Sequence, residues 1–151
     1  MIEDNRKSFL ELKIIWKDDD MFELKVTASN IEFRGTTELY DQPESLAKFA
    51  SALIGFPKDS ETLFYEKGEK DSCAYFSMKY YIIRWSGYLE VEICLESNVS
   101  DEYRQEEKSK VKLEIIVESN AIDNFQRELL HLAKNKEGSA ILYGNDNRLD
   151  N

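Results

Sequence analysis

The sequence contains few of the residues that interrupt regular structure or supply common active-site chemistry. It has only two prolines and six glycines in 151 residues, which favours regular elements over long loops. One histidine and two separated cysteines are too few for a zinc-ligand set. The chain contains neither a glycine-rich phosphate loop nor a nucleophile elbow. We therefore predict no catalytic residue, no metal site and no cofactor.

Positive charge is also scarce, because 20 Lys and Arg residues face 30 Asp and Glu residues and leave a formal net charge of −10. This charge opposes a phosphate backbone, so we expect no nucleic-acid binding. No apolar run approaches the length of a membrane span, and the N-terminus MIEDNRKSF has no apolar signal-peptide core. We expect a cytoplasmic protein whose acidity serves either solubility alone or a basic protein partner.

The length and the 8 Phe, 8 Tyr and 2 Trp residues predict one folded domain, at residues 1–134. From residue 135 the composition becomes polar, so residues 135–151 are predicted to be a flexible tail. Cys73 and Cys94 are predicted to be free thiols, because the expected strand register separates them by roughly 20 Å. Free thiols are consistent with a reducing compartment.

The clearest local pattern is a predicted β-hairpin at residues 80–95, YYIIRWSGYLEVEICL. Its second strand alternates apolar and charged or polar residues, and alternate side chains of a strand point to opposite faces. The inward row comprises Leu89, Val91, Ile93 and Leu95. Ser86-Gly87 is predicted to form a two-residue turn that places Trp85 opposite Tyr88.

Alternating or β-rich runs predict seven strands, at residues 8–17, 22–28, 31–40, 61–67, 73–85, 88–97 and 111–117. The inward residues are expected to be Leu10, Leu12, Ile14 and Trp16 in the first strand and Ile31, Phe33 and Leu39 in the third. Asp18-Asp19-Asp20 is predicted to be a solvated turn, and residues 98–109 a long mobile loop.

Helical spacing predicts two amphipathic helices. The first, at residues 43–54, follows Asp41 and Glu44, whose spacing fits a capping box. Asn120 with Asp123 is predicted to cap the second helix, whose apolar stripe comprises Ile122, Phe125, Leu129 and Leu132. His131 lies off this stripe, so we expect it to be exposed and to have no catalytic role.

The predicted order of elements is βββα followed by ββββα. Each strand has one apolar face and each helix has one apolar side. We therefore predict an α+β fold, in which a largely antiparallel sheet of about seven strands carries both helices on one face. A closed β-barrel with flanking helices is the alternative.

The outer face of the predicted hairpin is the candidate functional site. The register that buries the inward row sends large aromatic residues outward beside two carboxylates, a combination that suits a protein-contact surface. The residues concerned are Tyr81, Ile83, Trp85, Tyr88, Glu90 and Glu92. Alternatively, these aromatic residues shield the sheet, pair across strands, or lie beneath the loop at 98–109 or the tail.

Four segments between about residues 8 and 134 resemble a group of small, acidic bacterial proteins. These segments are LELKIIWKDDDMFELKVTASNIEF, PESLAKFASAL, YLEVEICLES and KVKLEIIVESNAIDNFQRELLHL. The group includes immunity proteins of wall-associated, contact-dependent toxins. The resemblance implies a protein that neutralises a cognate toxin domain, and it implies no catalytic residues.

These observations predict a non-enzymatic protein-binding protein whose partner is a basic toxin domain or another protein. One alternative is an enzyme or small-ligand carrier with a pocket between the helices and the sheet. Another is a self-associating structural protein whose homodimer buries Tyr81, Trp85 and Tyr88.

Overall fold

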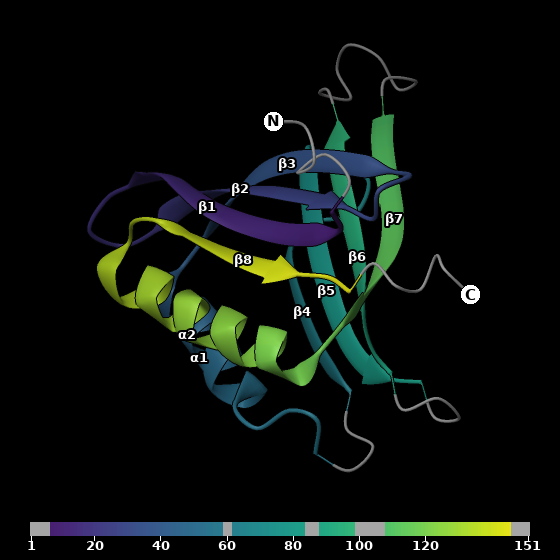
Figure 1. The fold of residues 1–151 in the computed structure, drawn as a ribbon. Coiled ribbons are helices and arrows are strands. Elements are labelled where there is room, and N and C mark those ends of the chain that lie inside the picture. The colour runs from purple at the N-terminus through teal and green to yellow at the C-terminus, as the bar shows by residue number, and fades with distance from the viewer. Residues whose placement is uncertain (1–6, 59–61, 84–87, 99–107, 146–151) are drawn as a thin grey trace, which may run out of the picture.

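The computed structural model describes residues 7–58, 62–83, 88–98 and 108–145, which form eight strands and two helices (Figure 1). The strands are β1 (Phe9–Lys17), β2 (Phe22–Ser29), β3 (Arg34–Asp41), β4 (Leu63–Gly68), β5 (Ala74–Ile82), β6 (Leu89–Asn98), β7 (Lys108–Val117) and β8 (Ser139–Tyr143). The helices are α1 (Pro43–Leu53) and α2 (Ser119–Asn135).

The strands form two antiparallel four-stranded sheets, which confirms the α+β class. Sheet A has the order β3-β2-β1-β8, and sheet B has the order β4-β5-β6-β7. In Figure 1 the strands of sheet A cross the long strands of sheet B, and β3 contacts all four strands of sheet B. The sequence predicted about seven strands in a single sheet. Alternation reveals which face of a strand is apolar, but it does not reveal which sheet the strand joins.

The order of elements consists of two successive βββαβ units. The first unit runs from β1 to β4 and the second from β5 to β8. In each unit the strand after the helix pairs with the first strand of the other unit, so β4 joins β5 and β8 joins β1. This exchange ties the two sheets together and places α1 against α2.

The core lies between the inner faces of the two sheets and the two helices. Its aromatic centre joins α1 to sheet B, where the Phe49 ring lies 5.0 Å from the Tyr65 ring and 5.6 Å from the Tyr80 ring, centroid to centroid. The predicted helical stripe of α2 is fully buried. The predicted inward row of β6 is buried as well.

Trp16 does not face the core, contrary to prediction. The pairing of β1 with β2 shifts between Ile14 and Trp16, which marks a β-bulge with Ile15 as the extra residue. Beyond the bulge Trp16 points to the outer face of sheet A, where it is 46% exposed and contacts Tyr40 edge to face. One extra residue reverses the face on which the following side chains lie.

Ile31 and Phe33 belong to a turn instead of the third strand. Asn30 closes this turn, because its backbone N–H donates to the Phe33 carbonyl and its side chain accepts from the Phe33 N–H. Ile31 has a φ of 85° and Phe33 is 62% exposed. The turn at Asp18, in contrast, is confirmed, since the Asp18 carboxylate accepts the N–H groups of Asp20 and Met21 at 2.9 Å.

The predicted caps of both helices are wrong. The N-cap residues are Gln42 for α1 and Glu118 for α2, and neither makes a side-chain capping hydrogen bond. Asp41 lies at the end of β3 and its side chain is buried. The predicted capping carboxylate therefore belongs to the interior.

The predicted tail at 135–151 contains a strand. Residues Ser139–Tyr143 form β8, which pairs antiparallel with β1. Its burial alternates, with Ala140 and Leu142 buried, but five residues of alternation were too few to outweigh the polar flanks. Residues 146–151 lie outside the described ranges, as do most of the predicted loop at 98–109 and the predicted turn at Ser86-Gly87.

The hairpin register differs from the predicted one by two residues. Ile82 pairs with Leu89 and Ser77 pairs with Cys94, whereas the two-residue turn placed Lys79 opposite Cys94. A shift of two preserves the faces, because side chains alternate with a period of two. Cys73 and Cys94 are free thiols, as predicted.

Candidate functional site

The structure brings five of the six predicted contact residues together on or beside the outer face of sheet B. Tyr81 on β5 pairs with Glu90 on β6, and Glu92 lies one step along the same face. Ile83 and Tyr88 follow at the ends of these strands, where the Ile83 N–H donates to the Tyr88 carbonyl at 2.8 Å. The sixth residue, Trp85, lies outside the described residues.

Exposure varies strongly among these residues. Tyr88 is 50% exposed, whereas Tyr81 and Ile83 are half-buried. Glu90 is only 7% exposed, although the alternation predicts a solvated side chain. In its cross-strand row Glu90 lies between Tyr81 and the buried Ile116, and these bulky neighbours account for its burial.

The sequence did not single out Glu114, which the tertiary structure adds to this face. Glu114 on β7 pairs directly with Glu92 on β6, so two carboxylates oppose each other across the ladder. Like charges in this position repel and destabilise a sheet. The Glu92 carboxylate also lies 3.3 Å from the Lys112 ammonium. Only the register of β7 against β6 reveals the acidic pair.

Tyr81 lies at the centre of the carboxylates. Burial raises the pKa of its phenol well above the ordinary value, and a hydrogen bond to Glu114 and the charges of Glu114, Glu90 and Glu92 raise that pKa further. The Lys79 ammonium lies 5.7 Å from the centre of the Tyr81 ring. Tyr81 therefore remains a neutral hydrogen-bond donor at physiological pH.

Phe64 is a second residue that the sequence did not single out. It pairs with Lys79 at the β4 edge of the same face and is 52% exposed. Two exposed aromatic side chains, Phe64 and Tyr88, thus accompany the carboxylates. We call this surface the acidic-aromatic face; it comprises Phe64, Tyr81, Tyr88, Glu90, Glu92 and Glu114.

A separate polar cluster is buried where β3, β4 and α1 meet. Asp41 is 2% exposed, and its carboxylate accepts hydrogen bonds from the Tyr65 hydroxyl and from the Gln42 N–H. The Lys67 ammonium lies 3.4 Å from the same carboxylate and 3.1 Å from the Ser45 hydroxyl. Burial raises the pKa of Asp41 despite these partners. The cluster joins the two sheets to α1.

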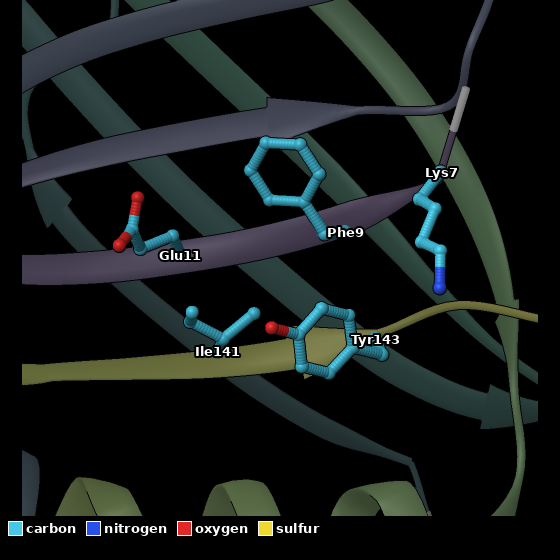
Figure 2. A pocket seen from close by; sticks show the side chains of 5 residues that line it. All are labelled: Lys7, Phe9, Glu11, Ile141 and Tyr143. Atoms are coloured by element: carbon cyan, nitrogen blue, oxygen red, sulfur yellow. The ribbon is translucent and has the colours of Figure 1, made fainter. Parts of the chain in front are cut away.

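A shallow depression of about 370 Å³ lies on the outer face of sheet A (Figure 2). Figure 2 shows Phe9 and Glu11 on β1 and Ile141 and Tyr143 on the neighbouring β8, with Lys7 at one end. This lining is mixed apolar and charged. A second depression, of about 300 Å³, shares Ile141 and Tyr143 but extends toward α2.

The described residues contain no group of three or more His, Cys, Asp or Glu side chains placed to hold a metal ion. His131 is exposed on α2, as predicted, and its ring nitrogens lie 2.9 and 3.2 Å from the side-chain amide of Asn135. Across the described ranges, neither helix has the length and apolar character needed to cross a membrane.

Comparison with known proteins adds no family assignment, because no protein-family model and no curated protein matches the chain.

Proposed function

We propose that this chain is a non-enzymatic protein-binding domain that holds a basic partner on the acidic-aromatic face. The observation that carries the proposal is the direct opposition of Glu92 and Glu114 across the ladder. Lys112 and the cross-strand neighbour Lys79 offset part of this repulsion at Glu92, and a partner's cationic side chain placed between the two carboxylates would offset more of it. The buried Glu90 and the Tyr81 hydroxyl, which bonds to Glu114, lie beside this pair and add to the negative potential around it.

The exposed aromatic side chains support the same surface. Phe64 and Tyr88 are each about half exposed, and aromatic residues of this kind often anchor protein interfaces. The net charge of −10 favours rapid encounter with a basic protein. Aromatic side chains beside carboxylates suit a partner that presents arginine or lysine near apolar residues.

The partner we propose is a cognate toxin domain, which makes the chain an immunity protein. This assignment rests on the sequence resemblance to immunity proteins of wall-associated, contact-dependent toxins. In that role the chain acts in the cytoplasm and neutralises the toxin by covering its surface. A gene for a large secreted toxin next to the gene for this chain would support the role.

The decisive experiment pairs the protein with the toxin domain encoded by such a neighbouring gene. The test variant carries Glu92→Gln and Glu114→Gln, and calorimetric titration should show at least about tenfold weaker binding. The control variant carries Glu23→Gln and Glu38→Gln, which remove the same charge from the outer face of sheet A. An unchanged dissociation constant for the folded test variant would refute the acidic-aromatic face as the contact surface.

Self-association is the competing use of this face. A homodimer would bury Tyr81 and Tyr88 against a second copy, and sedimentation of the unmixed protein would detect it. We expect a monomer at micromolar concentration, because two copies of an acidic face repel each other. A dimer that dissociates when Tyr88 is changed to Ser would favour the structural role.

A further inference from the structure

Strand β8 forms an edge of sheet A, and its hydrogen-bond phase shows which groups point outward. The Gly144 N–H donates to the Ser8 carbonyl at 2.9 Å, and the Ile14 N–H donates to the Gly138 carbonyl at 3.0 Å. In this phase residues 140 and 142 bond to β1. The backbone N–H and C=O groups of Ser139, Ile141 and Tyr143 therefore point away from the sheet, in the direction from which another strand could pair with them.

A side chain from α2 occupies the middle of this edge. The Ile141 N–H donates to the Glu128 carboxylate at 2.8 Å, in the position where the carbonyl of a neighbouring strand would lie. Glu128 is itself exposed, and α2 runs beside β8 (Figure 1). A helical side chain thus replaces the missing strand at one hydrogen bond.

The two depressions lie on either side of β8. On the α2 side, the depression of about 300 Å³ is lined by Asn124, Arg127, Glu128 and His131 together with Ile141 and Tyr143. On the outer face of sheet A, the depression of about 370 Å³ offers Phe9 and the other faces of Ile141 and Tyr143 (Figure 2). An extended chain along the β8 edge would occupy the depression beside α2 and direct alternate side chains toward Ile141 and Tyr143 and toward α2.

We propose that the β8 edge is a second binding site, which accepts an extended segment of a partner protein as a fifth strand of sheet A. The segment alternates apolar residues, which lie beside Ile141 and Tyr143, with basic residues, which face α2. A backbone carbonyl of the segment accepts the hydrogen bond from the Ile141 N–H. The Glu128 carboxylate, which this carbonyl displaces, pairs with a basic side chain of the segment. Strand addition at a sheet edge is a common mode of peptide recognition.

Charge complementarity favours this occupant. Arg127 and Glu128 both line the depression beside α2; Glu128 bonds to the strand edge, whereas Arg127 bonds to Asn124 on its own helix. The chain as a whole carries a net charge of −10, which also favours a basic segment. A second copy of this chain would bring the same net negative charge to the edge, which disfavours it as the occupant.

The test uses an end-capped heptapeptide of alternating valine and lysine, titrated into the isotopically labelled protein and followed by NMR. The background protein carries Glu92→Gln and Glu114→Gln, so the peptide cannot bind through the acidic-aromatic pair. We expect the largest shifts at the Ile141 and Tyr143 amides, and slower hydrogen exchange at Ile141 in the complex. Replacing lysine by glutamate in the peptide should weaken binding by at least about tenfold.

Two controls separate strand addition from general charge attraction. Glu128→Gln keeps an acceptor for the Ile141 N–H but removes the charge, so it should abolish most of the preference for lysine over glutamate. Asp123→Asn removes an equal charge elsewhere on α2 and should leave the preference intact. N-methylation of alternate valines should abolish binding, because it removes the strand hydrogen bonds.

Several results would overturn the inference. One is an equal loss of preference in the Glu128 and Asp123 variants, and another is binding that survives N-methylation. Peptide-independent self-association through β8, detected by sedimentation, would replace the partner segment by a second copy. Since the acidic-aromatic pair is already neutralised in the background, failure here leaves the proposed function untouched.

Discussion

At the residue scale, Asp41 shows how the buried environment of a carboxyl group sets its protonation. The side chain accepts hydrogen bonds from Tyr65 and Gln42 and lies near Lys67, and all three favour the ionised form. Burial opposes ionisation more strongly, so the pKa of Asp41 in the folded protein lies above its ordinary value of 3.8. The folded state therefore binds the Asp41 proton more tightly than the unfolded state does.

The sign of the resulting pH dependence follows from linkage. Below pH 3.8 the carboxyl group is protonated in both states, and the stabilisation due to the raised pKa is fully present. As pH rises through the folded pKa, the native group must ionise and this stabilisation is lost. Asp41→Asn removes the ionisation, so the variant should gain stability relative to the original protein as pH rises above 3.8.

Urea unfolding at a series of pH values measures this difference directly. The difference in the free energy of unfolding between variant and original protein isolates Asp41 from other groups that titrate in the same range. The raised pKa of Asp41 would be contradicted if the stability advantage of the variant over the original protein stayed constant or decreased as pH rises. Ser45→Ala, which touches the cluster only through Lys67, serves as a control without a carboxyl group.

At the element scale, the crossing of β3 over sheet B requires close backbone approach. Gly35 lies in β3 where the strand passes Val111 of β7 and Leu95 of β6. A Cβ at Gly35 would lie 2.6 Å from the Val111 Cγ1, which is closer than carbon atoms approach in proteins. Glycine is therefore needed here for space between the sheets, and not for a turn.

Gly35→Ala should destabilise the protein by about 1–3 kcal/mol, because the added methyl group overpacks the contact between the sheets. Val111→Ala removes the atom that would clash, so the double variant should lose less stability than the two single changes combined. A double-mutant cycle from chemical denaturation measures this coupling. If the stability changes of the two single variants simply add in the double variant, the destabilisation by Gly35→Ala does not arise from the contact with Val111.

The same scale explains which elements pattern alone could predict. Both amphipathic helices and most strands carry enough alternation or helical spacing to be located within a few residues. Pattern alone does not locate β8, because it is short and has polar flanks, and because its inward residues become recognisable as such only when it pairs with β1 and packs against α2. The sequence does not reveal the bulge near Ile15. Because all three residues of the run IIW are apolar, the pattern does not show which of their side chains face the core.

At the scale of the whole molecule, the net charge of −10 acts on partners at a distance. If a basic partner binds, its association rate should fall steeply from about 0.01 M to about 1 M salt, as the screening length falls from about 30 Å to about 3 Å. The dissociation rate should change much less, because short-range contacts govern it. Stopped-flow measurements separate the two rates, and a salt-independent association rate would contradict electrostatic steering.

The sequence by itself determined the class of fold, the two helices, the inward row of β6 and the outward direction of Tyr81 and Glu92. Side-chain direction depends only on local backbone period, which the residue pattern records. The tertiary structure decided the division into two sheets, the burial of Glu90 and Asp41, the opposition of Glu92 and Glu114, and the place of β8. These features depend on which strands become neighbours, and no local pattern in this chain encodes that choice.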